Sequence, residues 1–476
     1  MWNHGGAHKS HHLHKHRKGD GSSSHEMDMI HGPLLGKITM FALPLAVSSV
    51  LQQVFNMTDA IMAGQLIDAA ALAAVGGNAV VVSLFLNLFV GLAVGANAVI
   101  ARFIGEGNTS RLQNAIHSVM VLALISGVLL VVVGLVSAEW LLVLIDTPSN
   151  ILVDATLYLR VYFMGMIFIM IYNFGSAVMR SKGDTKRPLY ALIVAGVLNV
   201  GLNFVLVGWG VAGLAAATAL SNGVSAAMVL WWMTHDDAAY RLHFNKLRVH
   251  WPSMKAVLAI GVPAGIQGMV FSLSNVCIQG GINSFGSAAV AGSAAAVNAE
   301  FVSYFFVSAY VQTAVTFIAQ NYAAGDVERC KKVFLICMVS ALAVAIFTNA
   351  LFVIGGDTFL AIFTADAAAI SFGWVRLLRV ETCQFLVSSY EITAGALRGM
   401  GSSMLPAVIT ILGTCFLRFA WVLFVFPLNH DLYWLLTVYP VTWVVTGIAM
   451  VIAYIVVSRR KYAAISGQKT VEVEGE

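Results

Sequence analysis

Long apolar stretches alternate with short polar connections along almost the whole chain. An α-helix rises about 1.5 Å per residue, so about 20 apolar residues cross the roughly 30 Å hydrocarbon core of a membrane. Stretches of this length occur twelve times and predict an all-α integral membrane protein with twelve transmembrane helices. The expected spans lie near residues 38–62, 76–101, 115–137, 157–179, 188–207, 211–233, 257–281, 294–319, 333–354, 377–397, 405–426 and 433–457.

Composition agrees with this pattern. The 476 residues are 59% hydrophobic and only 11% charged, with a mean hydropathy of +0.82. A chain of this size has too little charge to cover a soluble globule. The formal net charge of +4 comes from the polar connections, so we expect a lipid bilayer as partner and no nucleic acid. The five cysteines have no metal-binding spacing, and we expect no metal site and no disulfide framework.

The distribution of basic residues predicts the orientation. Of the 27 Lys and Arg, 23 lie in the two tails or in connections after even-numbered spans. By the positive-inside rule, both termini are expected in the cytoplasm. The first 33 residues lack the apolar core of a cleavable signal peptide. We therefore expect a multi-pass protein of the plasma membrane, or of the inner membrane in a Gram-negative cell.

Both ends of the chain are hydrophilic. Residues 1–33 are rich in histidine, glycine and serine and are expected to form a disordered cytoplasmic tail, and residues 461–476 form a second tail. The favoured interpretation of the first tail is a solvated segment without a required function. Loose chelation of a transition metal, and hence metal-ion efflux, is the alternative for its histidines His11, His12, His14 and His16.

The two halves of the chain resemble each other at an offset of about 218 residues. ARFIGEGNTSR matches AQNYAAGDVER, and RSKGDTKRP matches RGMGSSMLP. Six spans per repeat is an even number, so both halves enter the membrane with the same orientation. We expect two pseudo-symmetric six-helix lobes around a central cleft, at residues 34–234 and 256–460, joined by a cytoplasmic linker at residues 235–255.

The first span carries a polar stripe with one acid. Gln52, Asn56 and Asp59 follow one another at helical spacing and share one face. A carboxylate at membrane depth is costly and normally faces a bundle interior or a water-filled cavity. We therefore expect Asp59 to bind a sodium ion or a proton, with Asn199 and Asn203 of the fifth span completing the site. A structural polar contact between helices is the alternative.

Polar residues in the second half are candidates for substrate binding. Glu300 is followed one helical turn later by Tyr304, and this pair suits a lipophilic cation through charge and cation-π attraction. Glu391 corresponds to Asn173 in the first repeat, so the lobes are unequal at this depth. The seventh span adds Gln279.

Each of the acidic residues has a structural alternative. Glu300 is alternatively a charge at the membrane edge, and Glu391 an ion-pair partner of Arg398 or Arg418. For Glu381 an interfacial salt bridge with Arg379 is the preferred interpretation.

Six segments together resemble the multidrug and toxic compound extrusion family, the MATE transporters. They are MTDAIMAGQL, RSKGDTKRP, LNVGLNFVLVGWGVAGLAAAT, NVCIQGGINSFG, AQNYAAGDVER and LRGMGSSMLP. The resemblance covers the chain from about Leu34 to Arg460 and implies an antiporter that exports organic cations and amphipathic drugs in exchange for protons or sodium. Many relatives have an aspartate where this chain has Asn203, so Asp59 is expected to be the only acidic ligand of its lobe.

Other functions remain as alternatives. A flippase for lipid-linked precursors needs a cationic cleft, whereas the cleft expected here is acidic. An integral-membrane enzyme needs a nucleophile and base or a metal cluster inside the bundle, and the histidines outside the tail lie at span ends or in loops. No nucleotide-binding motif is present. We therefore expect a transporter that is not an enzyme, has no cofactor beyond its coupling ion, and acts as a monomer.

Overall fold

The computed structural model describes residues 26–145 and 147–474, and every regular element in these ranges is helical. Residues 1–25 of the expected histidine-rich tail lie outside them, whereas residues 26–33 are described. The helices of the first half are α2 (Leu34–Met62), α3 (Ala69–Gly105), α4 (Thr109–Leu144), α5 (Leu152–Met164), α6 (Met166–Ser181), α7 (Lys186–Leu206) and α8 (Val211–Thr234). The second half contains α9 (Trp251–Asn283), α10 (Ser287–Ala323), α11 (Val327–Ile354), α12 (Gly356–Phe363), α13 (Ala367–Arg379), the 3-10 segment η5 (Glu381–Leu386), α14 (Val387–Gly399), α15 (Met404–Thr410), α16 (Leu417–Ala420), α17 (Leu432–Leu436) and α18 (Val438–Glu474).

Within the described ranges, ten helices are long and apolar enough to cross a membrane. An eleventh span is formed by α5 and α6 together, which bend by 44° at the break around Gly165. The expected span near residues 377–397 is interrupted by η5, and the flanking helices α13 and α14, with 13 residues each, are too short to meet the same criterion. This span therefore consists of separate pieces in the structure.

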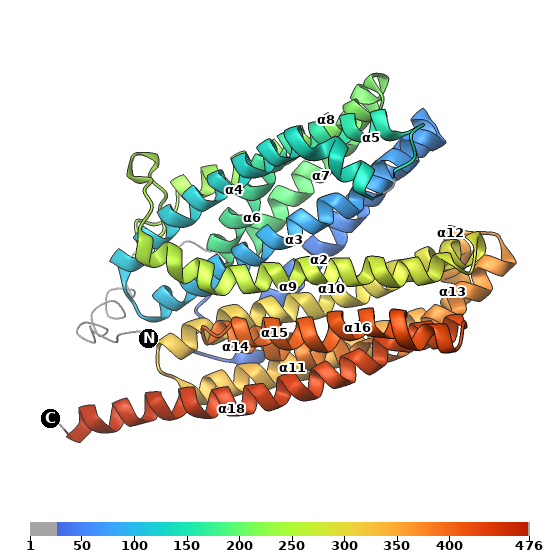
Figure 1. Ribbon diagram of the computed structural model, residues 1–476. Helices are drawn as coiled ribbons and strands as arrows, with labels where there is room; N and C mark the ends of the chain where they lie inside the picture. Colours follow the sequence, from blue (N-terminus) through green and yellow to red (C-terminus); the bar gives the residue numbers. More distant parts are fainter. Residues whose placement is uncertain (1–25, 146, 475–476) are drawn as a thin grey trace.

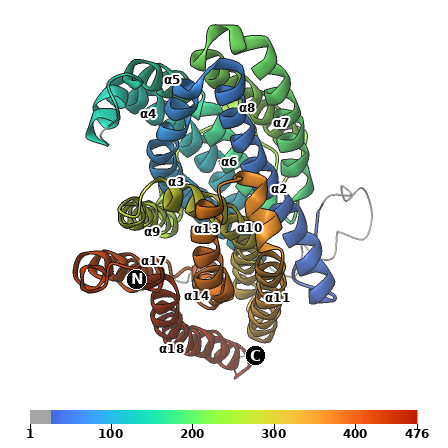
Figure 2. The ribbon, with the colours of Figure 1, turned by 90° about the vertical axis from the view of Figure 1, so that its right-hand side faces the viewer.

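The helices form two bundles that lie close together at one end and diverge towards the other (Figure 1). We call α2 to α8 the N-terminal lobe and α9 to α18 the C-terminal lobe. Viewed along the bundles, the two lobes are separate groups with α3 and α9 between them (Figure 2). The close end carries the turns after α6 and α10 and the C-terminal end of α18, and we call it the terminal end. The opposite end, with α12 and α13, is the far end.

The first helix of each lobe crosses into the core of the other lobe. Near the terminal end, α2 contributes Ile38 and Phe41 to the core of the C-terminal lobe, where the Phe41 ring meets Phe317 edge to face at 5.5 Å. Conversely, Val257 and Ile260, near the start of α9, lie in the core of the N-terminal lobe. The two lobes therefore share apolar surface at the terminal end. The lobe boundaries expected from the sequence stay predictions.

Glycines allow α3 and α9 to pack with their backbones in contact. A Cβ atom added to Gly91 would lie 2.1 Å from the backbone nitrogen of Gly265, and one added to Gly95 would lie 2.6 Å from that of Gly261. Small residues permit such close approach of helices in membranes. Because α3 and α9 belong to different lobes, these glycines determine how closely the lobes meet.

We expect Gly91→Ala to lower the thermal unfolding temperature of the purified protein in detergent. The added methyl group has to displace the α9 backbone, and overpacking of this kind costs about 1–3 kcal/mol. Gly77→Ala on the same helix is the matched control, because a Cβ atom there meets nothing within 4 Å. Alanine is the better helix former by about 0.5–1 kcal/mol, so the control is expected to unfold at the same or a higher temperature. Equal shifts for both variants would contradict the close α3–α9 contact.

Candidate functional site

Asp59 lies at the centre of a polar site inside the N-terminal lobe. Its side chain is 7% exposed. Asn203 Nδ2 donates a hydrogen bond to Asp59 Oδ1 at 2.6 Å, and Thr218 Oγ1 donates one to Oδ2 at 2.8 Å. Asn199 joins through a 3.4 Å hydrogen bond between its Oδ1 and Asn203 Nδ2. The structure thus gathers α2, α7 and α8 around one carboxylate.

The packing of α2 on α7 explains this arrangement. A Cβ atom added to Gly196 would lie 1.7 Å from the ring of Phe55, so Phe55 occupies the space that a side chain on α7 would need. Asp59 follows Phe55 by one helical turn, and Asn203 follows Gly196 by two. The glycine therefore allows the two helices to approach until the carboxylate and the amide meet.

No basic residue neutralises Asp59. Among the described residues it forms no ion pair, and its hydrogen-bond partners are one amide and one hydroxyl. The buried Asn203 Oδ1 has no hydrogen-bond partner. A carboxylate with further oxygen atoms from amides and a hydroxyl can take up a small cation or a proton. Thr218 was missed by the sequence analysis, because nothing in the sequence distinguishes its hydroxyl from those of Ser221 and Ser225 in the same span.

Gln52 and Asn56, the other two members of the stripe on α2, are exposed, whereas Asp59 is buried. Neither forms a hydrogen bond or ion pair within the described part of the chain. The helical spacing put all three on one side of α2, but the packing of α7 and α8 encloses only the last. The ligand role of Gln52 and Asn56 stays a prediction.

Glu391 on α14 is half-buried and forms no hydrogen bond or ion pair with another described residue. Glu391 therefore makes no direct ion pair with Arg398 or Arg418, although its charge interacts with that of Arg398. Arg398 donates from Nη2 to Gln267 Oε1 on α9 at 2.7 Å. Tyr304 also lies close to Glu391. An unpaired carboxylate beside an aromatic ring suits an organic cation.

Glu300 forms an ion pair with an arginine. Arg376 on α13 donates to both carboxylate oxygens, from Nε at 2.5 Å and from Nη2 at 2.9 Å. The same arginine bonds Ser293 and lies over the ring of Tyr439, 5.4 Å from its centre. The alternative of a charge at the membrane edge stays open, but the charge is paired and not isolated. The proposed substrate role of Glu300 stays a prediction. Because Arg376 holds both oxygens of Glu300, Glu391 is the more available carboxylate.

Glu381 is the acid that the sequence analysis placed incorrectly. Its side chain is 0% exposed, and it accepts a hydrogen bond from Ser303 Oγ at 2.5 Å. Arg379, the expected salt-bridge partner, turns instead to Thr437 at 3.0 Å and stacks over Tyr433. The Oε2 atom of Glu381 is buried without a hydrogen-bond partner. A buried acid without a base of its own is a second place in the protein where a cation can be held.

Arginines also lie in the interior of the C-terminal lobe, and the acidic character of the central cleft stays a prediction. Arg418 is 0% exposed, donates to Asn275 Oδ1 at 2.8 Å, and lies between the rings of Phe271 and Tyr439. Its Nε and Nη2 atoms have no hydrogen-bond partner, and neither has Nε of Arg398. The C-terminal lobe therefore offers both an unpaired acid and unsatisfied guanidinium groups.

The side chains of the two remaining candidates form hydrogen bonds within their own helices. Gln279 donates to Asn283 Oδ1 on its own helix at 2.9 Å. Asn173 donates to the backbone oxygen of Ile169, also on its own helix, at 3.0 Å. The structure does not bring either of them to Glu391 through a hydrogen bond, and their substrate role stays a prediction.

A family model matches the chain twice. The model is MatE, and it covers residues 44–205 and again residues 263–423, so that the second match begins 219 residues after the first. The chain belongs to the MatE family. Members of this family are transporters and not enzymes, and the duplicated match agrees with the internal repeat in the sequence. The predicted family and the predicted absence of enzymatic activity are confirmed.

Curated relatives of this MatE protein are transporters of several kinds. It is 27% identical over 398 residues to the probable multidrug resistance protein YoeA of Bacillus subtilis, covering 79% of this chain and 83% of the relative. It is 26% identical to the probable multidrug resistance protein NorM of Thermotoga maritima, over 79% of this chain and 82% of the relative. A third relative, 26% identical over 60% of this chain and 64% of its own length, is a FAD transporter of Shewanella oneidensis.

Solved structures confirm the fold of the MatE chain. A multidrug resistance MATE transporter in an outward-facing conformation superposes with a TM-score of 0.84 at 20% identity, covering 94% of this chain and all of the other. A transporter of the MOP superfamily from Pyrococcus furiosus gives a TM-score of 0.83, also at 20% identity, over 94% of this chain and 100% of that chain. These neighbours have twelve helices in two lobes, so the predicted fold class is confirmed.

Proposed function

We propose that this protein is a secondary active antiporter that exports cationic or amphipathic organic compounds in exchange for protons or sodium ions. The observation that carries the proposal is Asp59: a buried carboxylate held by Asn203 and Thr218, with no basic partner among the described residues. A fixed ion pair would already satisfy such a charge. Without one, a cation or a proton from the medium has to do so, and this makes the lobe responsive to an ion gradient.

Alternating access supplies the transport step. The lobes meet at the terminal end and diverge at the far end (Figure 1). A ligand shifts such an equilibrium only by its difference in affinity for the two states. We propose that ion binding at Asp59 changes the preferred lobe arrangement, and that Glu391 with Tyr304 binds the organic cation.

We further propose that the terminal end faces the cytoplasm of a monomeric plasma-membrane protein. This orientation rests on the 23 of 27 basic residues that the sequence places on that side. Substrate is then released at the far end, on the other side of the membrane.

A transport assay in proteoliposomes tests the coupling. The efflux of a fluorescent organic cation is measured with a sodium gradient alone and with a proton gradient alone. We expect one of the two gradients to accelerate efflux and the other to leave it near the rate without a gradient, because one ion occupies Asp59. If neither gradient changes the rate while the dye still crosses, the antiport mechanism is wrong.

A second substrate class is favoured by the unsatisfied guanidinium groups of Arg398 and Arg418. Such groups bind carboxylates and phosphates, and one relative is a FAD transporter. We propose that anionic or zwitterionic nucleotides compete with the dye. Inhibition of dye efflux by FAD supports this class, and no inhibition at millimolar FAD argues against it.

A further inference from the structure

The short segment before the first transmembrane helix contacts both lobes at the terminal end. This segment, residues 26–32, runs from the N-terminal lobe across to the start of α11 and then leads into α2. Met29 within it is 1% exposed and belongs to the apolar core of the C-terminal lobe. A loop that only led into a transmembrane helix would have no need for such burial.

The C-terminal lobe holds the segment through its backbone. Arg329 on α11 donates from Nε to the oxygen of Met29 at 3.2 Å, from Nη1 to that of Gly32 at 3.0 Å and from Nη2 to that of His31 at 3.0 Å. Asn321 Nδ2 adds a 3.2 Å hydrogen bond to the Met29 oxygen. One guanidinium group thus fixes three carbonyl groups, and hydrogen bonds from a charged donor are about twice as strong as neutral ones.

The N-terminal lobe holds the same segment more loosely. The Met27 amide donates to the oxygen of Lys182, in the turn after α6, at 3.4 Å. Lys182 Nζ lies 4.0 Å from Glu26 and forms a closer ion pair with Asp236. Met27 also covers Gly183, where an added Cβ atom would lie 2.6 Å from the Met27 Cβ.

The segment therefore strengthens a contact between the lobes that already exists beside it. Gln320 on α10 donates directly to the oxygen of Ser181 at the end of α6, at 2.6 Å. We propose that residues 26–32 form a latch that stabilises the state closed at the terminal end. Because its bonds to the C-terminal lobe are shorter and more numerous, the latch stays on α11 and leaves the turn after α6 when this end opens.

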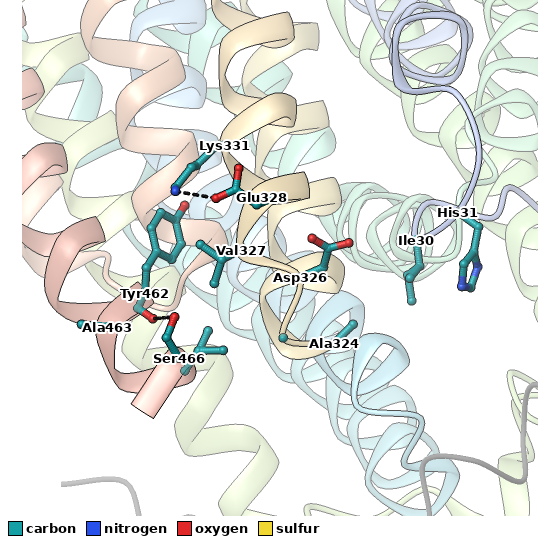
Figure 3. Close-up of a pocket in the computed structure, with 12 residues that line it drawn as sticks. Ile30, His31, Ala324, Asp326, Val327, Glu328, Lys331, Tyr462, Ala463 and Ser466 are labelled. Carbon is teal, nitrogen blue, oxygen red and sulfur yellow. Dashed lines mark hydrogen bonds and ion pairs between the residues drawn. The ribbon is translucent and has the colours of Figure 1, made fainter. Parts of the chain in front are cut away.

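A pocket lies beside the latch. A pocket of about 610 Å³ separates Ile30 and His31 from the turn after α10 and from α18. Figure 3 shows Ile30 and His31 across from Asp326 and Val327, with Tyr462 and Ser466 farther away on α18.

The inference rests on the lobe movement of the proposed function, and its test measures that movement rather than transport. Spin labels on cysteines introduced at the exposed positions Ser110 and Arg460, in a chain without its natural cysteines, report the distance between the lobes at the terminal end. Arg329→Gln removes the charged donors, and Lys332→Gln is its matched control. Lys332 lies on the same helix, is exposed and does not line the pocket beside the latch. Deletion of residues 1–32 is compared in the same way with deletion of residues 1–25, which keeps the latch.

We expect Arg329→Gln and the longer deletion to lower the ratio of closed to open lobes by about tenfold or more, which corresponds to about 1.4 kcal/mol. Both controls are expected to keep the distance distribution of the unmodified chain. If the arginine variant does not fold, the pair of deletions decides alone. A latch is excluded if the longer deletion gives the same distribution as the shorter one. A change in distance without any dye transport supports the latch and counts against the proposed function alone.

Discussion

Replacing Asp59 with asparagine is expected to reduce gradient-driven dye efflux to the rate of liposomes without protein. Asparagine keeps the size of the side chain, and its single amide oxygen can still accept one of the two hydrogen bonds that Asn203 and Thr218 now donate to the carboxylate at 2.6 and 2.8 Å. It carries no charge, so the variant has nothing for an incoming cation or proton to neutralise. The initial rate of efflux from proteoliposomes, with the amount of folded protein equalised, is the measurement.

Glu139→Gln is the matched control for this experiment. It removes one acid by the same chemical change, but Glu139 is exposed and its contact with Arg160 is 3.8 Å long. Exposed pairs of this kind contribute only about 0–1 kcal/mol, and efflux is expected to be unchanged. Ion-driven efflux that persists in the Asp59 variant at the unmodified rate would remove this residue from the coupling mechanism. Glu381, the other buried acid without a base of its own, would then become the leading candidate.

Replacing Arg376 with methionine is expected to destabilise the protein by about 3–5 kcal/mol, because removal of one partner leaves a buried charge without compensation. Arg376 is 4% exposed and donates to both oxygens of Glu300. The same change leaves Glu381 without the nearest positive charge, since both acids interact with this arginine. Thermal unfolding in detergent is the measurement, and the unfolding temperature is expected to fall.

A double variant separates the lost pair from the lost packing. Glu300→Gln together with Arg376→Met removes both charges, and the unfolding temperature is expected to recover part of the loss, because a buried pair replaced as a whole is often tolerated. Arg160→Met is the control, because the Arg160 side chain is 42% exposed and lies 3.8 Å from its partner Glu139, and it is expected to change little. If the double variant is no more stable than Arg376→Met alone, unpaired charge is not the cause of the destabilisation.

The Asp59 site shows which ligands can be predicted from the local sequence. Hydropathy and helical spacing selected Asp59, Asn199 and Asn203, and the structure joins these three by hydrogen bonds. Thr218 could not be selected in this way, because a hydroxyl in an apolar span usually bonds its own helix. It does bond the Leu214 oxygen at 3.2 Å as well. Only the packing of α8 against α7, which in turn packs against α2, brings it to the carboxylate.

For the charged residues of the second half, the interaction partners could not be predicted from the sequence. Glu391 and Arg398 lie two helical turns apart on one helix and still form no ion pair, because Arg398 reaches across to Gln267 on α9. Glu381 is adjacent in sequence to a region rich in arginine, yet it turns to Ser303 on α10. Pairing between charged residues on different helices depends on how each helix is rotated about its axis and on the depth of each residue in the bundle. A single sequence specifies neither.

The sequence by itself determined the membrane class, the helical content, the duplication and the acid in the first span, because these depend on hydropathy and spacing along one chain. The tertiary structure decided which buried charges are neutralised and which remain unpaired. It also decided that α2 and α9 cross between the lobes, and that residues 26–32 connect them. These features depend on the close approach of helices that are distant in the chain, at glycines such as Gly91 and Gly196. Short-range patterns carry no information about that approach.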